Sequence, residues 1–314
     1  MSNKATREGF GLALTELAAD NPEVMAICAD LRTSLCLDDF ATRFPQQYVE
    51  VGVGEQNMAG VAAGLAMNGR TVFAASFAAF NPGRNWEQVR VSVCLQNLNV
   101  KIVGSHAGLA TGEDGATHQS LEDLAITTVL PNMTVVVPAD FNQAQRATRV
   151  LALEHVGPAY LRLSRLKTPT FTNLNQPFKL GRADILREGG DLTIVACGLM
   201  VERAMAAAAI LAAQHQLEAT VINCHTLKPL DQETLLAAAQ KTPLFVTAEE
   251  HQLIGGLGSI IATFLATHHP LPIEMVGVRD TFGKSGSGEE LLNRYHLNAE
   301  AIVEAALRGR ARLN

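Results

Sequence analysis

One glycine-rich stretch, residues 106–119, holds the densest group of side chains that could do chemistry. It contains His106, Asp114 and His118 together with three glycines. Imidazoles can move protons near neutral pH, a carboxylate can orient a substrate hydroxyl, and glycines let the backbone approach a ligand. Two histidines and an aspartate could instead bind a metal, but this spacing is not a usual ligand pattern, so we assign no metal ligand. A solvated turn remains the other alternative.

A second candidate is Glu55, which follows Gly52-Val-Gly54 where a predicted strand passes into a predicted helix. Its neighbours are apolar, and burial favours the protonated carboxyl, so Glu55 could serve as a proton donor near neutral pH. The alternative is an ordinary acid in the first turn of a helix, where the dipole favours negative charge. The glycines lack the third glycine of a dinucleotide-binding fingerprint. Gly283-Lys284-Ser285 likewise fails as a phosphate-binding loop because of its spacing from Gly277.

Aromatic residues make up only 5% of the chain, and two of them, Phe77 and Phe80, follow a strand predicted over residues 71–75. They could stack against a flat heterocycle or simply fill the core. Arg165 follows a strand-like run over residues 159–163. Its guanidinium could bind a phosphate or sulfonate in a bidentate manner, or form an ion pair between domains.

The elements that must position these residues alternate between short β-branched runs and longer Ala/Leu-rich segments. This alternation predicts α/β domains with mostly parallel, doubly wound sheets covered on both faces. A segment rich in Pro, Thr and Asn interrupts the pattern and reads as a linker. We therefore predict a first domain over residues 1–168, a linker over 169–182 and a smaller α/β domain over 183–314. The predicted strands are 23–28, 71–75, 99–103, 133–137, 159–163, 192–196, 219–223 and 244–247, and the predicted helices are 7–19, 56–67, 86–96, 142–154, 201–214, 231–240 and 259–268.

Composition narrows the class of protein. The net charge is −6 with no basic run, which argues against binding to nucleic acid or an anionic membrane. Five widely spaced cysteines and the lack of a long apolar run favour a cytoplasmic protein over a secreted or membrane protein. The second domain shows no comparable polar set at its strand ends. We therefore assign it to assembly, with His251, Lys284 and Ser285 as candidates only for subunit contacts.

Five separate motifs are spread over the first domain: Cys28-Ala-Asp30-Leu31, Gly52-Val-Gly54-Glu55, Ser76-Phe77-Ala-Ala-Phe80, Gly112-Glu-Asp114-Gly115-Ala-Thr-His118-Gln119 and Leu163-Ser-Arg165. Together they resemble the motifs of transketolases. The whole chain resembles the C-terminal half of a transketolase, and specifically the small (B) subunit of a split, two-chain transketolase. The resemblance implies a pyrimidine-binding domain followed by a transketolase C-terminal domain, with thiamine diphosphate bound between two different chains.

The resemblance implies a cofactor role for five residues. Glu55 matches the glutamate that hydrogen-bonds N1′ of the aminopyrimidine and favours the imino tautomer, whose N4′ removes the thiazolium C2 proton. Phe80 matches the aromatic residue that stacks on the pyrimidine ring, with Phe77 beside it. Asp30 and Leu31 match residues that line the cofactor pocket.

The resemblance also implies substrate contacts. His106 and His118 match histidines that handle the substrate hydroxyl and carbonyl groups, and Asp114 matches the acid that contacts the C2 hydroxyl. The positions that match the binding site for the distal phosphate of a sugar are Arg7, Ser34, His106 and Arg165.

The chain departs from the family pattern in two places. Asn81-Pro-Gly-Arg84 stands where a further aromatic residue is common, which leaves the outer wall of the pyrimidine pocket undefined. The Gly-Asp-Gly…Asn signature for diphosphate and Mg²⁺ is missing from the sequence. The resemblance therefore implies that the diphosphate and Mg²⁺ are held by a second chain, a transketolase N-terminal (A) subunit, in an A2B2 heterotetramer.

The implied activity is transfer of a two-carbon ketol unit from a phosphate- or sulfonate-bearing ketose to an aldose. The alternatives are a subunit like 1-deoxyxylulose-5-phosphate synthase, a subunit like the β chain of 2-oxoacid dehydrogenase E1, and a non-catalytic assembly subunit. A chain that starts just before the pyrimidine-binding domain disfavours the first, and the sequence of the 106–119 loop disfavours the second. Intact Glu55, Phe80, His106 and His118 disfavour the third. Pentose phosphates, branched-sugar phosphates and sulfosugars all remain possible substrates.

Overall fold

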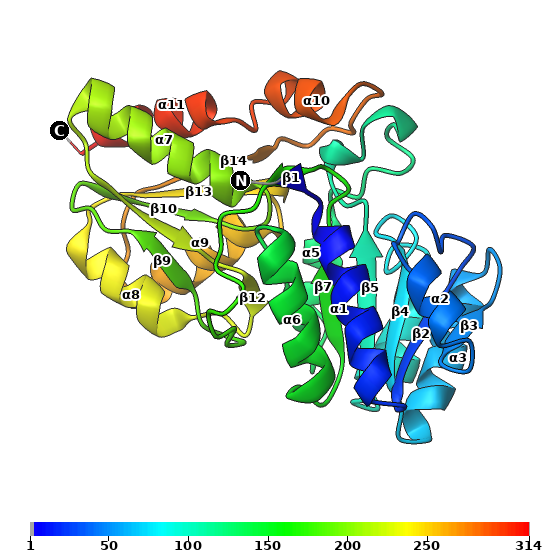
Figure 1. Cartoon of the computed structure of the whole chain (residues 1–314). Coiled ribbons are helices and arrows are strands. Elements are labelled where there is room, and N and C mark those ends of the chain that lie inside the picture. The colour runs from blue at the N-terminus through cyan, green and yellow to red at the C-terminus, as the bar shows by residue number, and fades with distance from the viewer. Residues whose placement is uncertain (1–2, 314) are drawn as a thin grey trace.

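Two open α/β sheets lie side by side in the computed structural model, which describes residues 3–313 (Figure 1). The first sheet has seven strands in the order β12-β6-β7-β5-β4-β2-β3, and all pairs except β12–β6 are parallel. Parallel pairing requires a crossover between strands, and the helices supply it. The strands are β2 (Val24–Cys28), β3 (Tyr48–Glu50), β4 (Thr71–Phe77), β5 (Val100–Ser105), β6 (Thr134–Val136), β7 (Ala159–Arg162) and β12 (Thr226–Lys228).

Helices cover both faces of this sheet, as the near-continuous apolar strands require. In β4, Phe73 and Ala75 pack toward α1 (Thr6–Asp20) and α6 (Phe141–Leu153). The alternate residues, Val72 and Ala74, pack toward the other face. In Figure 1, α1 and α6 lie in front of the strands. The opposite face is covered by α3 (Glu55–Met67), α4 (Trp86–Gln88), the π-helical segment η1 (Val89–Cys94) and α5 (Asp123–Thr128).

The second sheet has the order β14-β13-β10-β11-β9, in which only β9 is antiparallel to its neighbour. One face carries α7 (Met200–His215) and α11 (Ala299–Ala311), and the other carries α8 (Gln232–Lys241) and α9 (Leu257–His268). Figure 1 shows these two helical layers above and below the strands. The strands are β9 (Asp184–Arg187), β10 (Leu192–Ala196), β11 (Ala219–Asn223), β13 (Phe245–Gln252) and β14 (Ile273–Val278).

The sequence prediction of doubly wound α/β domains is confirmed, and the structure corrects two local details. Residues 86–96 are not one α-helix, because α4 continues as the π-helical η1, whose wider turn buries Val89, Val93 and Cys94 together. The predicted linker, residues 169–182, begins within β8 (Thr168–Pro169), which pairs with β1 (Asn3–Lys4). The Asp140 carboxylate also accepts hydrogen bonds from the backbone of the residues at 171 and 172, so this segment is fixed to α6.

The two sheets are joined by β12, which the sequence analysis missed. This strand follows the linker, yet it pairs antiparallel with β6 and completes the first sheet. Leu227 and Cys224 share one hydrophobic core with Leu130 and Met133 of the first domain. A three-residue strand whose partner lies in another domain has too short a pattern to be read from sequence. The shared core holds the second domain firmly against the first.

Two further observations concern the chain as a whole. None of the helices within residues 3–313 combines the length and the apolar character needed to span a bilayer. All five cysteines lie in this described part of the chain as free thiols.

Candidate active site

The candidate residues gather because the parallel strands of the first sheet end at one edge. Asp30 follows β2, the turn before Glu55 follows β3, and Phe77 ends β4. His106 follows β5, and Arg165 lies three residues beyond β7. Ligands of open α/β sheets bind outside the carboxyl ends of the strands. The topology thus brings together residues from five separate stretches of sequence.

Glu55 is the first residue of α3, and its side chain is 2% exposed. The Arg84 guanidinium donates a 2.7 Å hydrogen bond to its carboxylate, and Asn85 donates to its backbone oxygen at 3.0 Å. The predicted burial of Glu55 is thus observed. The structure therefore adds a cation, Arg84, that occupies one oxygen of the Glu55 carboxylate.

Phe77 and Phe80 form an aromatic surface beside Glu55. Their ring centroids are 6.1 Å apart with an interplanar angle of 21°, and Phe80 is half-buried, unlike the buried Phe77. The Arg84 Cζ atom lies 4.6 Å from the centroid of Phe80. His118 meets the same ring edge-on at 5.2 Å. A partly open aromatic ring beside a buried carboxylate suits a flat heterocycle that carries a hydrogen-bonding nitrogen.

His106 is buried and held as the neutral imidazole. Its ring stacks on Phe77 at 3.9 Å, and its Nε2 lies 3.2 Å from Nη1 of Arg7. Because a guanidinium only donates, Nε2 must accept, and the proton resides on Nδ1, which donates to Ser105 Oγ at 3.0 Å. Burial, together with the positive charges of Arg7, Arg165 and His118, lowers the pKa of His106 to about 3. His106 can therefore orient a substrate hydroxyl, and it is not charged near neutral pH.

Two arginines mark the outer part of the site. Arg7 donates from Nη1 to the Ser34 carbonyl at 2.6 Å, while its buried Nε has no hydrogen-bond partner among residues 3–313. Arg165 donates from Nη1 to the Asp114 carboxylate and to the Thr111 carbonyl, both at 3.1 Å. The two residues expected to contact opposite ends of a sugar, Asp114 and Arg165, thus form an ion pair with each other.

A cavity of about 390 Å³ adjoins the Ser34 end of the site. Asp30, Leu31 and Ser34 line it, so three of the predicted residues share one wall. The Asp30 side chain is exposed, and its N–H donates to Glu50 Oε1 at 2.8 Å. Contacts therefore run from Glu55 through Arg84 and the aromatic rings to His106, Arg7 and Ser34. Asp30 lies outside this series of contacts and lines the adjoining cavity.

Glu50, which was not predicted from the sequence, links two turns that border the site. Its Oε1 accepts from the N–H groups of Asp30 and Gly52 at 2.8 and 3.0 Å, and its Oε2 accepts from Tyr48 Oη at 2.8 Å. The signal in the sequence was a carboxylate two residues before Gly52. A charged residue at the end of a short strand is usually a solvated position, so that signal was not distinctive.

Arg84 was also missed as a member of the site. Residues 81–84 are the part of the pocket wall that the sequence leaves undefined, and the structure places the Arg84 guanidinium there, against Glu55 and Phe80. Its side chain is 48% exposed. The sequence signal was a single cationic residue, Arg84, shortly after Phe77 and Phe80. The residue types of this turn do not predict which way the Arg84 side chain points.

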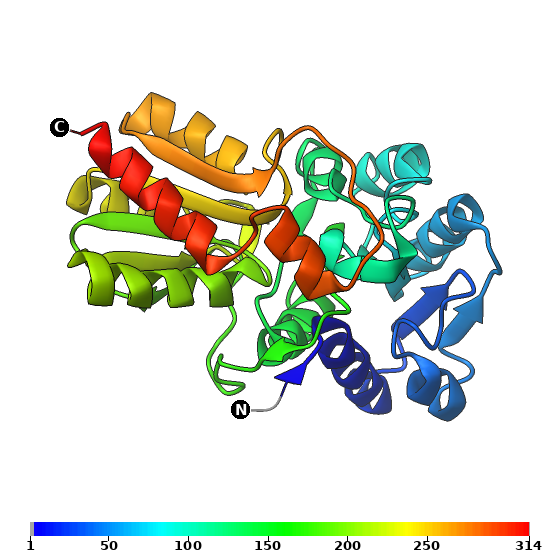
Figure 2. The ribbon, with the colours of Figure 1, turned by 90° about the horizontal axis from the view of Figure 1, so that it is seen from above.

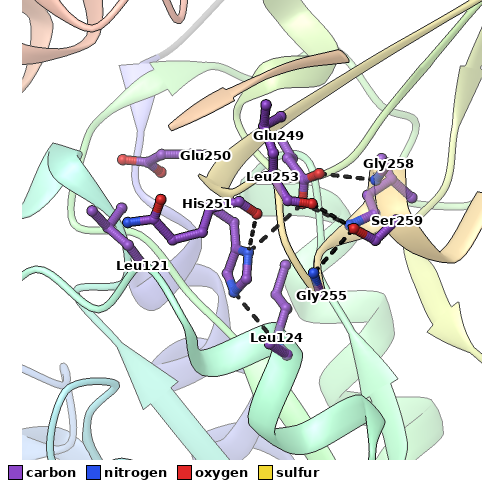
Figure 3. A network of polar contacts seen from close by, with 12 residues as sticks. Leu121, Leu124, Glu249, Glu250, His251, Leu253, Gly255, Gly258 and Ser259 are labelled. Carbon is purple, nitrogen blue, oxygen red and sulfur yellow. Dashed lines mark hydrogen bonds and ion pairs between the residues drawn. The ribbon is translucent and has the colours of Figure 1, made fainter. Parts of the chain in front are cut away.

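The structure corrects the expectation that the second domain lacks polar residues at its strand ends. Glu249, Glu250 and His251 are buried at the carboxyl end of β13. Figure 3 shows His251 between α5 and the turn before α9, where its Nε2 accepts from the Ala125 N–H at 3.4 Å. The Lys284 carbonyl accepts from Gln119 at 2.9 Å. His251 and Lys284 therefore make contacts between the two domains of this chain.

The donor set fits the pyrimidine half of thiamine diphosphate. It offers a buried carboxylate and a partly open aromatic ring, which are features that an aminopyrimidine needs. Within residues 3–313 there is no group of three or more His, Cys, Asp or Glu side chains arranged to hold a metal ion.

Comparisons with known proteins point to one family. Residues 2–170 match the transketolase pyrimidine-binding domain, and residues 181–302 match the transketolase C-terminal domain. The chain is 44% identical to the 6-deoxy-6-sulfo-D-fructose transketolase subunit SqwH of Clostridium sp. (strain MSTE9), over 96% of this chain and 92% of that protein. It is 37% identical to one of the subunits of the apulose-4-phosphate transketolase of Phocaeicola vulgatus, over 96% of each chain. Among solved structures, a split-gene transketolase described as an inactive β4 tetramer superposes with a TM-score of 0.91 at 44% identity, covering 98% of both chains.

Proposed function

The chain belongs to the transketolase family, and we propose that, with a partner subunit, it transfers a two-carbon ketol unit from an anionic ketose to an aldose. The observation that carries this proposal is the buried Glu55 carboxylate beside the Phe77–Phe80 surface, which the two loop histidines contact. That arrangement supplies the groups an aminopyrimidine cofactor needs and the groups a polyhydroxylated substrate needs, at one strand-end edge.

Thiamine diphosphate, on which the transketolase family depends, supplies the nucleophilic carbon for cleaving and forming C–C bonds. Glu55 would hydrogen-bond the aminopyrimidine of this cofactor, and Phe80 would stack on it. Leu31 and Asp30 would border it from the adjoining cavity. The diphosphate and Mg²⁺ would be held by the second chain, the N-terminal (A) subunit, since the Gly-Asp-Gly…Asn signature is missing from this chain.

Three residues would orient the substrate near the reacting carbons. Neutral His106 would accept a hydrogen bond from a substrate hydroxyl at Nε2, in exchange for the one that it accepts from Arg7. His118 is half-buried and meets both aromatic rings, so it lies where a bound sugar would pass the cofactor. Asp114 now pairs with Arg165. When substrate binds, this ion pair would break and Asp114 would contact the C2 hydroxyl.

The anionic end of the substrate would bind between Arg7 and Arg165, beside Ser34. The buried Arg7 Nε supports this assignment, because a buried donor without a partner is costly and an anionic oxygen would satisfy it. The names of the two relatives give a sulfonated sugar for one and a sugar phosphate for the other, so both of those substrates end in an anion. We propose a sugar phosphate or sulfosugar as the donor.

The active assembly would be an A2B2 heterotetramer. The similar split-gene chain is described as an inactive tetramer of β chains alone, which fits a subunit that assembles but needs its partner for catalysis. Sedimentation of this chain with and without its N-terminal partner tests the proposal. We expect the mixture to contain two copies of each chain.

The decisive test mixes this chain with its N-terminal partner, thiamine diphosphate and Mg²⁺, and then offers donors and acceptors in pairs. The donors are 6-deoxy-6-sulfofructose, apulose 4-phosphate and xylulose 5-phosphate, with an aldose phosphate as the acceptor. We expect ketol transfer from at least one anionic ketose, only when both chains are present. A complex that consumes pyruvate and leaves all three ketoses untouched would instead be an enzyme of the deoxyxylulose-phosphate-synthase or 2-oxoacid-dehydrogenase type.

A further inference from the structure

We propose that the C-terminal domain positions the 106–119 loop for catalysis, and that Glu250 is the positioning residue through which it does so. This inference rests on the proposed function insofar as that loop carries the histidines expected to orient the substrate. It assigns to the second domain of this chain a part in the reaction beyond assembly.

Glu250 reaches from β13 into the loop of the other domain. Its side chain is 3% exposed, and its Oε1 accepts a 2.6 Å hydrogen bond from the backbone N–H of Ala110. Gly108, with φ +82°, lies so close that a Cβ atom there would overlap the Glu250 carboxyl. The carboxyl therefore packs directly against the loop backbone, two residues from His106.

The loop is also held at its far end by the segment between β14 and α10 (Gly288–Arg294). Gln119 donates from Nε2 to the Lys284 carbonyl at 2.9 Å, and a Cβ atom on Gly115 would lie 2.5 Å from Ser285 Oγ. Figure 2 shows this segment extending from the second sheet to the loop that contains η2 (Leu109–Asp114). Contacts from one domain thus fix both ends of a loop that belongs to the other.

Glu250 is itself held in place from both domains. Arg162 donates from Nη2 to the Glu250 backbone oxygen at 2.8 Å, and the same guanidinium forms a buried ion pair with Asp123 at 2.7 Å. Glu249, the preceding residue of β13, accepts a hydrogen bond from the N–H of Gly258 at 2.9 Å. Figure 3 shows that Glu249 points toward the start of α9 whereas Glu250 points the opposite way. Two neighbouring acids of β13 thus secure different elements.

Ala110 is linked to His106 through Thr111, the next residue of the loop. Thr111 donates from Oγ1 to the His106 carbonyl, and its own carbonyl accepts from Arg165 at 3.1 Å. Moving Ala110 therefore moves the residue that anchors both His106 and Arg165. Because a small displacement of an orienting group lowers reaction rates strongly, Glu250 should affect catalysis without touching substrate.

The test compares Glu250→Ala with Glu250→Gln, which keeps an acceptor oxygen at Oε1. Glu274→Ala is the matched control, since Glu274 is an acid of β14 that pairs with Arg308 at 3.0 Å, at the end of that strand farther from the 283–288 segment. For each full-length variant, amide hydrogen exchange of the 106–119 loop is followed in the chain alone and in the reconstituted complex. Ketol-transfer kcat and KM are then measured with the complex.

We expect Glu250→Ala to speed exchange in the 106–119 loop by about ten-fold or more, because a buried hydrogen bond is lost. The kcat/KM for donor should fall by about ten-fold or more, while subunit assembly and thiamine diphosphate affinity stay at the wild-type level. Glu250→Gln should restore both loop protection and kcat/KM, and Glu274→Ala should change neither.

If amide hydrogen exchange of the 106–119 loop is unchanged in the Glu250→Ala variant, the inference is overturned, whatever the activity of that variant. A loosened loop with unchanged kcat/KM would also overturn it, because the contact would then be structural only. If the wild-type complex shows no ketol transfer at all, the proposed function fails and the positioning role fails with it. The exchange measurement would in that case still report whether Glu250 orders the loop.

Discussion

Arg84 donates a 2.7 Å hydrogen bond to the buried carboxylate of Glu55. The same guanidinium lies over one face of Phe80, with its Cζ 4.6 Å from the ring centroid. One exposed cation therefore contacts both of the residues expected to bind the aminopyrimidine. Arg84 would therefore compete with an aminopyrimidine for the Glu55 carboxyl.

We predict that Arg84→Met tightens thiamine diphosphate binding by several-fold, because the aminopyrimidine then no longer competes with Arg84 for the Glu55 carboxyl. The same change should destabilise the lone chain by about 1 kcal/mol, since a buried carboxyl loses a hydrogen bond. Isothermal titration of the reconstituted complex and chemical denaturation of the chain measure these effects. Arg90→Met, on the exposed side of η1, is the control. Weaker binding in the Arg84 variant would show that Arg84 helps to hold the cofactor.

His106 should remain neutral throughout the working range of the enzyme. Its pKa is lowered to about 3 by burial and by neighbouring positive charges, below the ordinary value of 6.5. It therefore contributes stability that is present above pH 6.5 and is lost as pH falls toward 3, at about 1.4 kcal/mol per pH unit. Histidine ¹⁵N chemical shifts at about pH 5.5, between these two values, should show a neutral ring protonated on Nδ1. An imidazolium signal from His106 at that pH would refute the prediction.

Glu250→Gln should change how stability depends on pH. Burial is the largest cause that raises the pKa of Glu250 from 4.5 to about 7, while Arg162 acts against it and Asp123 and Glu289 add to it. A raised pKa gives stability that is complete below pH 4.5 and is lost as pH rises through 7. The Gln side chain does not titrate, so the variant does not lose this stability as pH rises. The unfolding free energy of the variant minus that of the wild type should therefore rise by about 1.4 kcal/mol per pH unit between those values. Denaturation at several pH values within that interval measures the difference, and parallel curves would contradict it.

Glu50→Ala should weaken the cofactor site by releasing the two turns that Glu50 joins. Hydrogen bonds are lost at Asp30, Gly52 and Tyr48, and we expect about 1–2 kcal/mol lower stability and roughly ten-fold weaker thiamine diphosphate binding. Glu23→Ala serves as the control, because Glu23 is an exposed acid before the start of β2 that pairs with Arg70 at 2.6 Å. Equal cofactor affinity in the two variants would show that these turns are held without Glu50.

The strand–helix alternation was enough to predict a two-domain α/β fold and the sheet edge where the candidate residues lie. It succeeded because buried parallel strands are continuous apolar runs, and because residues just after them must share one edge of the sheet. His106, Phe77 and Arg165 could therefore be assigned to one region without a structure. The roles proposed for them remain predictions.

The relationships missed by the sequence analysis all join residues distant in sequence or depend on turn geometry. Glu250 resembles any other polar residue after an apolar run, and only the packing of β13 against the other domain shows what it contacts. The direction of Arg84 depends on the turn at residues 81–84. The pairing of β12 with β6 across the linker leaves no periodic signal at all.

The most direct test of the proposed function is ketol transfer by the reconstituted complex carrying Glu55→Gln. Assembly, measured by sedimentation, and overall fold, measured by circular dichroism, should match the wild type, because the amide has nearly the same shape as the carboxyl. We predict that kcat falls by about a hundred-fold or more, since the amide cannot supply the proton that the aminopyrimidine needs. Wild-type kcat in this variant, with assembly intact, would contradict the assignment of Glu55 and with it the catalytic role of this chain.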